Sequence, residues 1–220
     1  EFNDSKLSTP DESLWWYETG ASGWGNNEIQ NYIPGSKNGE TCAQVSNGTL
    51  KIIAKKVGNQ VLSIRMNTRQ SWKYGYFEAR LKLPKGKGTW PAFWMLPKNF
   101  TAWPDDGEID IMEHVGNQLN RIFGTLHYPG RSGGNADGAS VMISNATTEF
   151  HIYSMEWNAS NIKIYVDNQL FFTYNNNPNS PFNQNFFFIM NVAMGGNLGG
   201  AVDPNFTSST LEVDYIRVYQ

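Results

Sequence analysis

The chain has 220 residues, a formal net charge of −3 and only 17% charged residues. This length fits one domain over residues 1–220, because all-β sandwiches and barrels often reach this size. No basic run is present that could follow a phosphate backbone, so we expect no nucleic-acid partner. The one cysteine, Cys42, excludes an internal disulfide and a cysteine-based zinc cluster, and no apolar stretch approaches the ~18 residues of a membrane span.

The predicted elements are many short strands separated by turn residues. Apolar residues alternate with polar ones at Phe77, Ala79 and Leu81, and again at Ile162 and Ile164. Such strands at close spacing predict a sandwich or barrel, and the absence of a sustained 3.6-residue period predicts few and short helices. In chain order the expected strands are 49–57, 61–68, 76–83, 92–96, 107–115, 121–128, 149–157, 161–166, 169–174, 185–194 and 210–219.

Aromatic residues are abundant: the chain has 8 Trp, 10 Tyr and 13 Phe, or 14% of its residues. One interpretation is a bulky β core. Another is that part of this set lines a cleft and stacks on flat ligands such as the apolar faces of sugar rings. The count alone leaves both interpretations open.

The segment from Gly107 to Gly116 is the most informative. In a regular strand Glu108 and Asp110 would share one face, and Glu113 would point to the other face, into the core. An unpaired carboxylate is costly to bury. We therefore predict a one-residue β-bulge near Met112, which returns Glu113 to the face of the other two acids.

Three acids on one face repel each other unless one of them holds a proton, so their presence indicates a function. Two glutamates flanking an aspartate meet the needs of a retaining glycosidase, in which one carboxylate attacks and another donates a proton. The two glutamate backbones would lie roughly 13 Å apart along the strand. Side chains leaning together could narrow this to the ~5–5.5 Å of retaining enzymes. The alternatives are a solvated acidic strand or a calcium site.

The Glu108–Glu113 run resembles the signature of glycoside hydrolase family 16, and within that family it looks most like the laminarinases. Other segments that resemble the family, in the same order, are 24–28, 74–80, 88–94, 124–128, 191–196 and 213–219. The resemblance implies a β-jelly-roll sandwich of two antiparallel sheets with a concave substrate cleft. It also implies Glu108 as nucleophile, Asp110 as its assistant and Glu113 as acid/base.

The resemblance further implies a set of substrate-binding residues. Trp90 and Trp94 would line the glycone side of the cleft, and Trp103 precedes the acidic strand. His127 would lie near the leaving group. Asn27, Arg69 and Glu28 could bind sugar hydroxyls, and the alternative for each is a loop cap or surface ion pair; the resemblance favours cleft roles for Asn27 and Arg69 and leaves Glu28 open. Glu28 could orient Asn27 instead, and Asn191 could cap the turn before Gly195. The set is Asn27, Glu28, Arg69, Trp90, Trp94, Trp103, His127 and Asn191.

No organic cofactor is implied. The resemblance implies a structural calcium away from the cleft, held by Glu1, a carbonyl of Gly48 and Asp214, and oxygen-only ligands suit calcium. None of the three histidines forms an H-x-x-x-H pair, which gives little support for a transition metal.

We therefore expect a secreted or cell-surface, monomeric endo-β-1,3-glucanase that acts with retention, with mixed-linkage β-1,3-1,4-glucan as a further expected substrate. Because the sequence begins abruptly at Glu1, we expect a mature or trimmed form. The rival hypotheses are a lichenase-type enzyme, a transglycosylase, a glycanase for another polymer such as agar or carrageenan, and a non-catalytic glucan-binding jelly-roll module. The intact acids favour an enzyme over a binding module.

Overall fold

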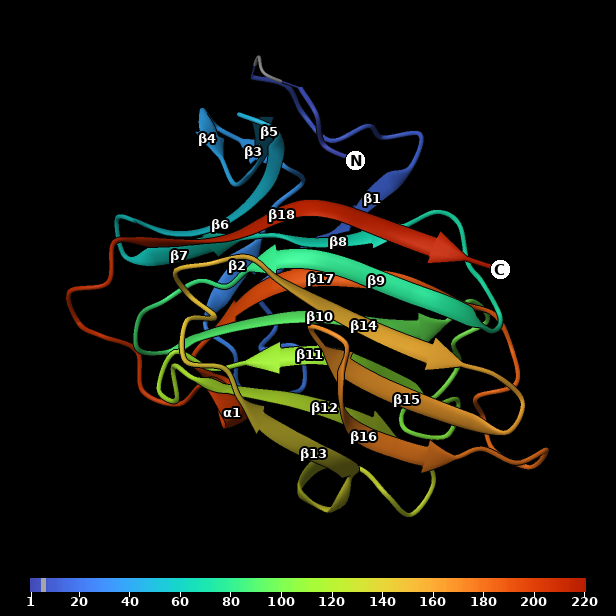
Figure 1. Ribbon diagram of the computed structural model, residues 1–220. Coiled ribbons are helices and arrows are strands. Elements are labelled where there is room, and N and C mark those ends of the chain that lie inside the picture. The colour runs from blue at the N-terminus through green and yellow to red at the C-terminus, as the bar shows by residue number, and fades with distance from the viewer. Residues whose placement is uncertain (5–6) are drawn as a thin grey trace.

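The computed structural model describes residues 1–4 and 7–220, and most of its regular elements are β-strands arranged in two facing sheets (Figure 1). Neighbouring strands of the sheets are antiparallel, apart from the parallel pair β2–β7. One sheet has seven strands, in the spatial order β1 (Trp15–Glu18), β8 (Arg65–Thr68), β17 (Phe186–Met194), β10 (Thr89–Pro97), β11 (Glu108–His114), β12 (Arg121–His127) and β13 (Asp137–Met142).

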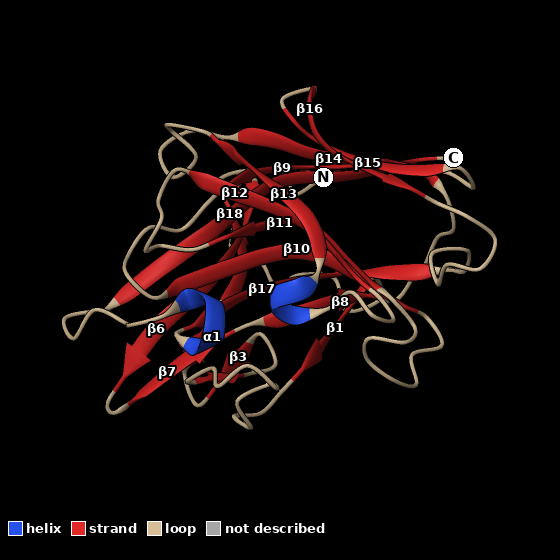
Figure 2. Ribbon diagram, turned by 90° about the horizontal axis from the view of Figure 1, so that it is seen from below, coloured by secondary structure: helices blue, strands red, loops and turns tan. Residues whose placement is uncertain are grey.

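The second sheet has nine strands. One of them, β5 (Ala43–Ser46), lies off the main strand order and pairs with β6. The other strands of this sheet run in the order β16 (Gln169–Asn175), β15 (Asn161–Val166), β14 (His151–Trp157), β9 (Gly75–Lys82), β18 (Ser208–Tyr219), β6 (Thr49–Val57), β7 (Gln60–Ser63) and β2 (Gln30–Tyr32). A small separate ribbon consists of β3 (Ser36–Lys37) and β4 (Glu40–Thr41). The described helices are two single turns, η1 (Gly133–Asn135) and α1 (Gly196–Gly199), seen in blue in Figure 2.

The inner faces of both sheets share one hydrophobic core. Phe77, Ala79 and Leu81 on β9 are fully buried, as are Ile162 and Ile164 on β15, which confirms the predicted alternation. Burying a side chain the size of Leu or Phe contributes about 1.5–3 kcal/mol. The expected all-β sandwich with few and short helices is therefore confirmed.

One predicted strand, 61–68, is two strands in different sheets. The chain leaves the nine-stranded sheet after Ser63, passes through the fully buried Ile64, and enters the seven-stranded sheet at Arg65. The Ser63 hydroxyl donates to the carbonyl of Val192 at 2.6 Å, which ties the crossing point to β17. This crossing places Arg65 on the sheet that carries the acidic strand.

In the described ranges, no helix has the length and apolarity that a bilayer crossing would require.

Candidate active site

The acidic strand β11 contains the predicted bulge. On one side Phe93 pairs with Met112 and Trp94 with Asp110, so Ile111 has no partner of its own on β10. On the other side the register also shifts between Asp110 and Glu113. As a result both Ile111 and Met112 lie in the core, fully buried. The bulge restores Glu113 to the outward face of the sheet; we call the side carrying Glu108, Asp110 and Glu113 the acid face.

His127 lies beside two of the three acids, and it is paired with Glu108 across β11 and β12. His127 Nε2 lies 3.2 Å from Asp110 Oδ2 and 3.7 Å from Glu108 Oε1. These three ligand-type atoms all lie within 4.8 Å of one another, and they form the one group of acidic and histidine side chains among the described residues that could hold a metal ion. His127 therefore lies beside Glu108 and Asp110, and its expected place near the leaving group stays a prediction.

Each glutamate accepts a hydrogen bond from a different indole. Trp103 Nε1 donates to Glu108 Oε2 at 3.1 Å, and Trp90 Nε1 donates to Glu113 Oε1 at 2.9 Å. Trp103 is 49% exposed, so it covers the nucleophile candidate from the solvent side. A hydrogen bond to a carboxylate favours its charged form. The two tryptophans thus position the two carboxylates that the proposed chemistry needs.

Burial is the largest influence on all three acids. It raises the pKa of Glu108 well above its usual value, helped by Asp110 and opposed by His127. It also raises the pKa of Asp110, helped by Glu113 and opposed by hydrogen bonding from Glu108. The pKa of Glu113 is raised by burial and lowered again by the Trp90 hydrogen bond. Because ionising one acid makes it harder to ionise its neighbours, the cluster holds a proton to higher pH than separate carboxyl groups would, which suits a general acid.

Trp94 takes part in a hydrogen-bonded chain rather than contacting an acid directly. Its Nε1 donates to Asn191 Oδ1 at 2.8 Å, and Asn191 Nδ2 donates to the Tyr32 hydroxyl at 3.0 Å. The Tyr32 hydroxyl in turn donates to Glu28 Oε2 at 3.4 Å. Asn191 is 6% exposed. Asn191 therefore holds Trp94 in place. Its described side-chain hydrogen bonds go to Trp94 and Tyr32, and neither caps the turn before Gly195.

Glu28 is hydrogen-bonded to residues other than Asn27. It accepts hydrogen bonds from Gln30 at 2.6 Å and from Asn26 at 3.2 Å, and burial raises its pKa. Asn27 has a positive φ of 57° and donates instead to Asn197 at 2.8 Å. Its place on an exposed loop is compatible with the predicted contact to sugar, which stays a prediction.

Arg65 is a site residue that the sequence analysis missed. Its guanidinium lies 4.9 Å from the Trp24 ring centroid and 4.6 Å from that of Trp94, and its Nε donates to Glu18 Oε2 at 2.5 Å. It also helps to lower the pKa of Glu108. An arginine between Ile64 and Met66 in an apolar strand is the signal that could have identified it.

The predicted substrate ligand Arg69 lies elsewhere. It follows the end of β8, is exposed, and its Nε donates to the carbonyl of Glu12 at 2.7 Å. No described contact joins Arg69 to the acids or to the tryptophans around them. The arginine that the structure brings to the acid face is Arg65, four residues earlier, because the chain leaves the sheet before position 69.

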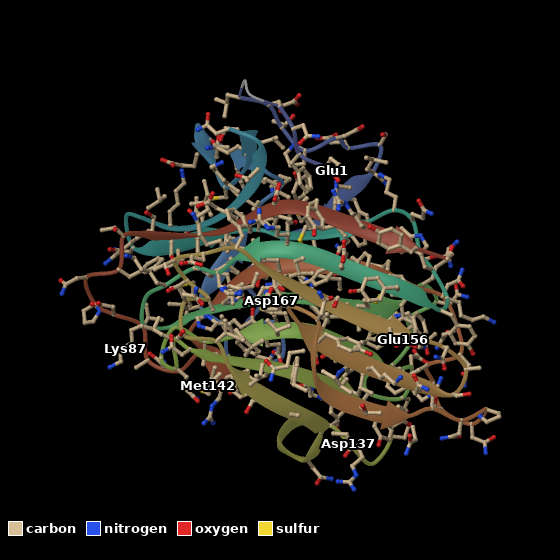
Figure 3. The ribbon with its side chains drawn as sticks, viewed as in Figure 1. Glu1, Lys87, Asp137, Met142, Glu156 and Asp167 are labelled. Carbon is tan, nitrogen blue, oxygen red and sulfur yellow. The ribbon has the colours of Figure 1, made fainter. Side chains whose placement is uncertain are left out.

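The predicted calcium ligands are not assembled by any described contact. Glu1 pairs with Arg217 at 2.5 Å, and Asp214 pairs with Arg80 at 2.5 Å. Gly48 donates its N–H to the carbonyl of Asp4 at 3.2 Å. Figure 3 shows Glu1 at the upper end of the molecule, on the N-terminal segment. Each of the two carboxylates thus has a guanidinium partner, and the predicted calcium site with its ligands stays a prediction.

Comparison with known proteins identifies the family. The family model for glycosyl hydrolases family 16 matches residues 30–217. A beta-glucanase of Rhodothermus marinus is 42% identical over all of this chain and 83% of its own length. The X-ray structure of the laminarinase from Rhodothermus marinus superimposes with a TM-score of 0.91 at 39% identity, covering 100% of this chain and 94% of that one.

A laminarinase structure from Flavobacterium sp. UMI-01 gives the same result, with a TM-score of 0.91 and 39% identity over 100% of this chain and 97% of that one. These similarities span both sheets and the acid face, so they confirm the jelly-roll sandwich together with the resemblance noted from the sequence. The chain belongs to glycosyl hydrolases family 16.

Proposed function

We propose that the protein is a retaining endo-β-1,3-glucanase of laminarinase type, with mixed-linkage β-1,3-1,4-glucan as a second substrate. The observation that carries the proposal is the bulge in β11, which presents Glu108, Asp110 and Glu113 on one face. The similar proteins support the substrate class, since they are a beta-glucanase and two laminarinases.

In the first step Glu113 acts as the general acid. It transfers a proton to the glycosidic oxygen as the bond to the leaving sugar breaks, and burial favours the protonated form of Glu113 that this step needs. At the same time a Glu108 carboxylate oxygen attacks the anomeric carbon and forms a glycosyl–enzyme ester. Trp103 and Asp110 keep Glu108 in place for this attack.

In the second step Glu113, now a carboxylate, takes a proton from a water molecule. The water oxygen bonds to the anomeric carbon, and Glu108 leaves as a carboxylate, so each group returns to its initial state. A sugar hydroxyl can replace the water. Some transglycosylation at high oligosaccharide concentration is therefore part of the same proposal.

Sugar binding is supported by the aromatic residues beside the acids. Trp94 lies next to Asp110 across β10 and β11 and is only partly buried, so it can stack on the apolar face of a pyranose ring. The guanidinium of Arg65 is held by its Nε, which leaves its two terminal nitrogens to donate to sugar hydroxyls. These groups lie on the β10–β8 side of the acids, where the glycone would bind.

We further propose that the enzyme is secreted or displayed at the cell surface and acts as a monomer. A polysaccharide substrate of this class is too large to enter a cell intact, which supports an extracellular site of action.

Product analysis on laminarin, lichenan and agarose in parallel tests the proposal, with Glu113→Gln as the inactive control. We expect short oligosaccharides from laminarin, a smaller yield from lichenan and none from agarose. Faster cleavage of lichenan would make the protein a lichenase-type enzyme. Binding of laminarin without any product would instead make it a glucan-binding module.

A further inference from the structure

The two ring nitrogens of His127 have different partners. Nε2 faces the acids, 3.2 Å from Asp110 Oδ2 and 3.7 Å from Glu108 Oε1. Asp110 is 3% exposed, and its Oδ2 has no well-aligned hydrogen bond within residues 1–4 and 7–220. Nε2 is the donor within reach of that buried oxygen, provided that it carries a proton.

The other nitrogen shows where the proton is. The backbone N–H of Gly133 donates to His127 Nδ1 at 3.1 Å. A nitrogen that accepts an N–H carries no proton itself, and a neutral imidazole has a single N–H. The proton is therefore on Nε2, because the hydrogen bond made by one ring nitrogen decides the state of the other.

Gly133 lies in loop 128–137, which follows β12 and ends at Asp137, the first residue of β13. Tyr128 and Arg131 exchange two backbone hydrogen bonds of 2.8 and 2.9 Å, and Asn135 Nδ2 donates to the carbonyl of Gly130 at 3.0 Å. The Tyr128 hydroxyl donates to Asp137, which also pairs with Arg131 at 3.6 Å. Figure 3 shows Asp137 at the lower edge of the molecule, where β13 begins. These hydrogen bonds and the ion pair hold the Gly133 N–H against the His127 ring.

We propose that loop 128–137 fixes the Nε2–H tautomer of His127, and that His127 is thereby a positioning residue whose Nε2–H points at Asp110 and Glu108 and favours the carboxylate form of these two acids. The inference rests on the proposed function, because the double displacement needs Glu108 as a carboxylate. The same tautomer leaves Nε2 without a lone pair for a cation, so the cluster is arranged for hydrogen bonding rather than for a metal ion.

His127 is one of a few groups around Glu108 that favour its carboxylate form. Asp110 and Glu113 on the same strand raise the pKa of Glu108, as does burial. His127 on β12 and Arg65 on β8 lower it, and the Trp103 indole donates to it. Loss of the His127 donor leaves Arg65 and the Trp103 indole to favour the carboxylate, so the pKa of Glu108 rises further.

Nitrogen-15 NMR of the unliganded protein tests the tautomer directly, with the His127 signals assigned by their loss in His127→Gln. We expect the chemical shift of an unprotonated Nδ1 and a protonated Nε2 near neutral pH. Gly133→Pro removes the donating N–H, and because proline cannot adopt the φ of 55° found at Gly133 it also moves the loop away from the ring; both changes should populate the other tautomer. Gly134→Pro removes a neighbouring N–H that does not contact His127 and should leave the signals unchanged. A protonated Nδ1 in the wild-type protein would overturn the proposal, whatever the variants do.

The kinetic test compares His127→Gln with His127→Asn. A glutamine amide can place an N–H near the position of Nε2, whereas asparagine reaches only the position of Nδ1. We expect kcat on laminarin to fall less than about 10-fold in His127→Gln and about 100-fold in His127→Asn, the usual effect of losing one charge-stabilising donor. The acid limb of kcat/KM should move to higher pH in His127→Asn.

Equal losses of kcat in the two variants, or an unmoved acid limb, would contradict the positioning role. The outcomes are separable from a failure of the proposed function. If the wild-type protein cleaved no glucan, the proposed activity would be wrong, and the NMR measurement on the free protein would still decide the tautomer.

Discussion

Arg65 illustrates how one residue acquires its role from its neighbours. Its guanidinium is stacked between Trp24 and Trp94 and is tethered to Glu18, and its side chain is only 13% exposed. A cation held over indole faces and shielded from water interacts more strongly than one at an exposed site. This environment favours Arg65 over Arg69 as the arginine that binds sugar.

Replacing each arginine by alanine tests this distinction. We expect Arg65→Ala to lower kcat/KM on laminarin by about 10–100-fold, since the cation–π contacts and the donors to sugar hydroxyls are both lost. Arg69→Ala is the matched control and should stay within about 2-fold, because the side chain is exposed and bonds a loop carbonyl. A larger loss in Arg69→Ala than in Arg65→Ala, measured by initial rates, would restore the sequence-based assignment.

At the scale of elements, β11 was predictable and β8 was not. The bulge followed from one requirement, that Glu113 avoid the core, and the structure confirms it. The crossing at Ile64 was missed because the run from 61 to 68 contains no Gly, Pro or Asn-Gly turn signal, and a buried residue carries the chain between sheets. The edge strand β13 was also missed, since its side chains alternate between half-buried and exposed without an apolar face.

Some residues of the site could be predicted from the sequence pattern, and others could not. Acids with a clear chemical role could be placed from their spacing alone. Residues such as Arg65 and Asn191 act through contacts between strands far apart in the sequence, and such contacts become visible only in the folded sheet. The calcium ligands were inferred from resemblance, and the arginine partners of Glu1 and Asp214 could not be read from the sequence.

The bulge also constrains the strand beside it. Gly124 on β12 lies between Phe123 and Thr125, the partners of Glu113 and Asp110, and an added Cβ there would approach the Phe171 ring to 2.9 Å. We expect Gly124→Ala to cost about 1–3 kcal/mol of unfolding free energy through overpacking. The thermal midpoint should fall by roughly 2–4 °C per kcal/mol for a chain of this size.

Gly134→Ala is the control for this experiment, because an added Cβ at Gly134 meets nothing within 4 Å. It should leave the midpoint nearly unchanged. If Gly124→Ala melted at the wild-type temperature in calorimetry, the tight packing behind the bulge would be refuted.

At the scale of the whole molecule, the acid face lowers the free energy of unfolding at neutral pH. Glu108 has a folded-state pKa well above that of the unfolded chain, because burial penalises its charge. The folded state therefore binds more protons than the unfolded state above the unfolded pKa of about 4.3. The stabilisation that protonated Glu108 gives to the folded state is fully present below that pH. It is lost as the pH rises from the unfolded-state pKa to the folded-state pKa.

Glu108→Gln removes this titration and should be more stable than the wild type at pH 7, with the advantage shrinking toward pH 4. The gain is about 1.4 kcal/mol for each unit by which the pKa is raised. Thermal midpoints of both proteins across pH 4–7 measure it, with the exposed Glu149→Gln as control. A variant whose advantage stayed constant over that range would show that Glu108 titrates normally.

The central claim is that Glu108 and Glu113, held on one bulged strand, carry out a double displacement. The account has the Glu108 carboxylate attack the sugar directly, whereas an inverting enzyme needs room for a water molecule between its catalytic base and the anomeric carbon. Proton NMR of the first products released from laminarin tests this claim most directly. The account predicts an initial β-anomer that then mutarotates, whereas an initial α-anomer would show inversion and contradict the roles assigned to Glu108 and Glu113.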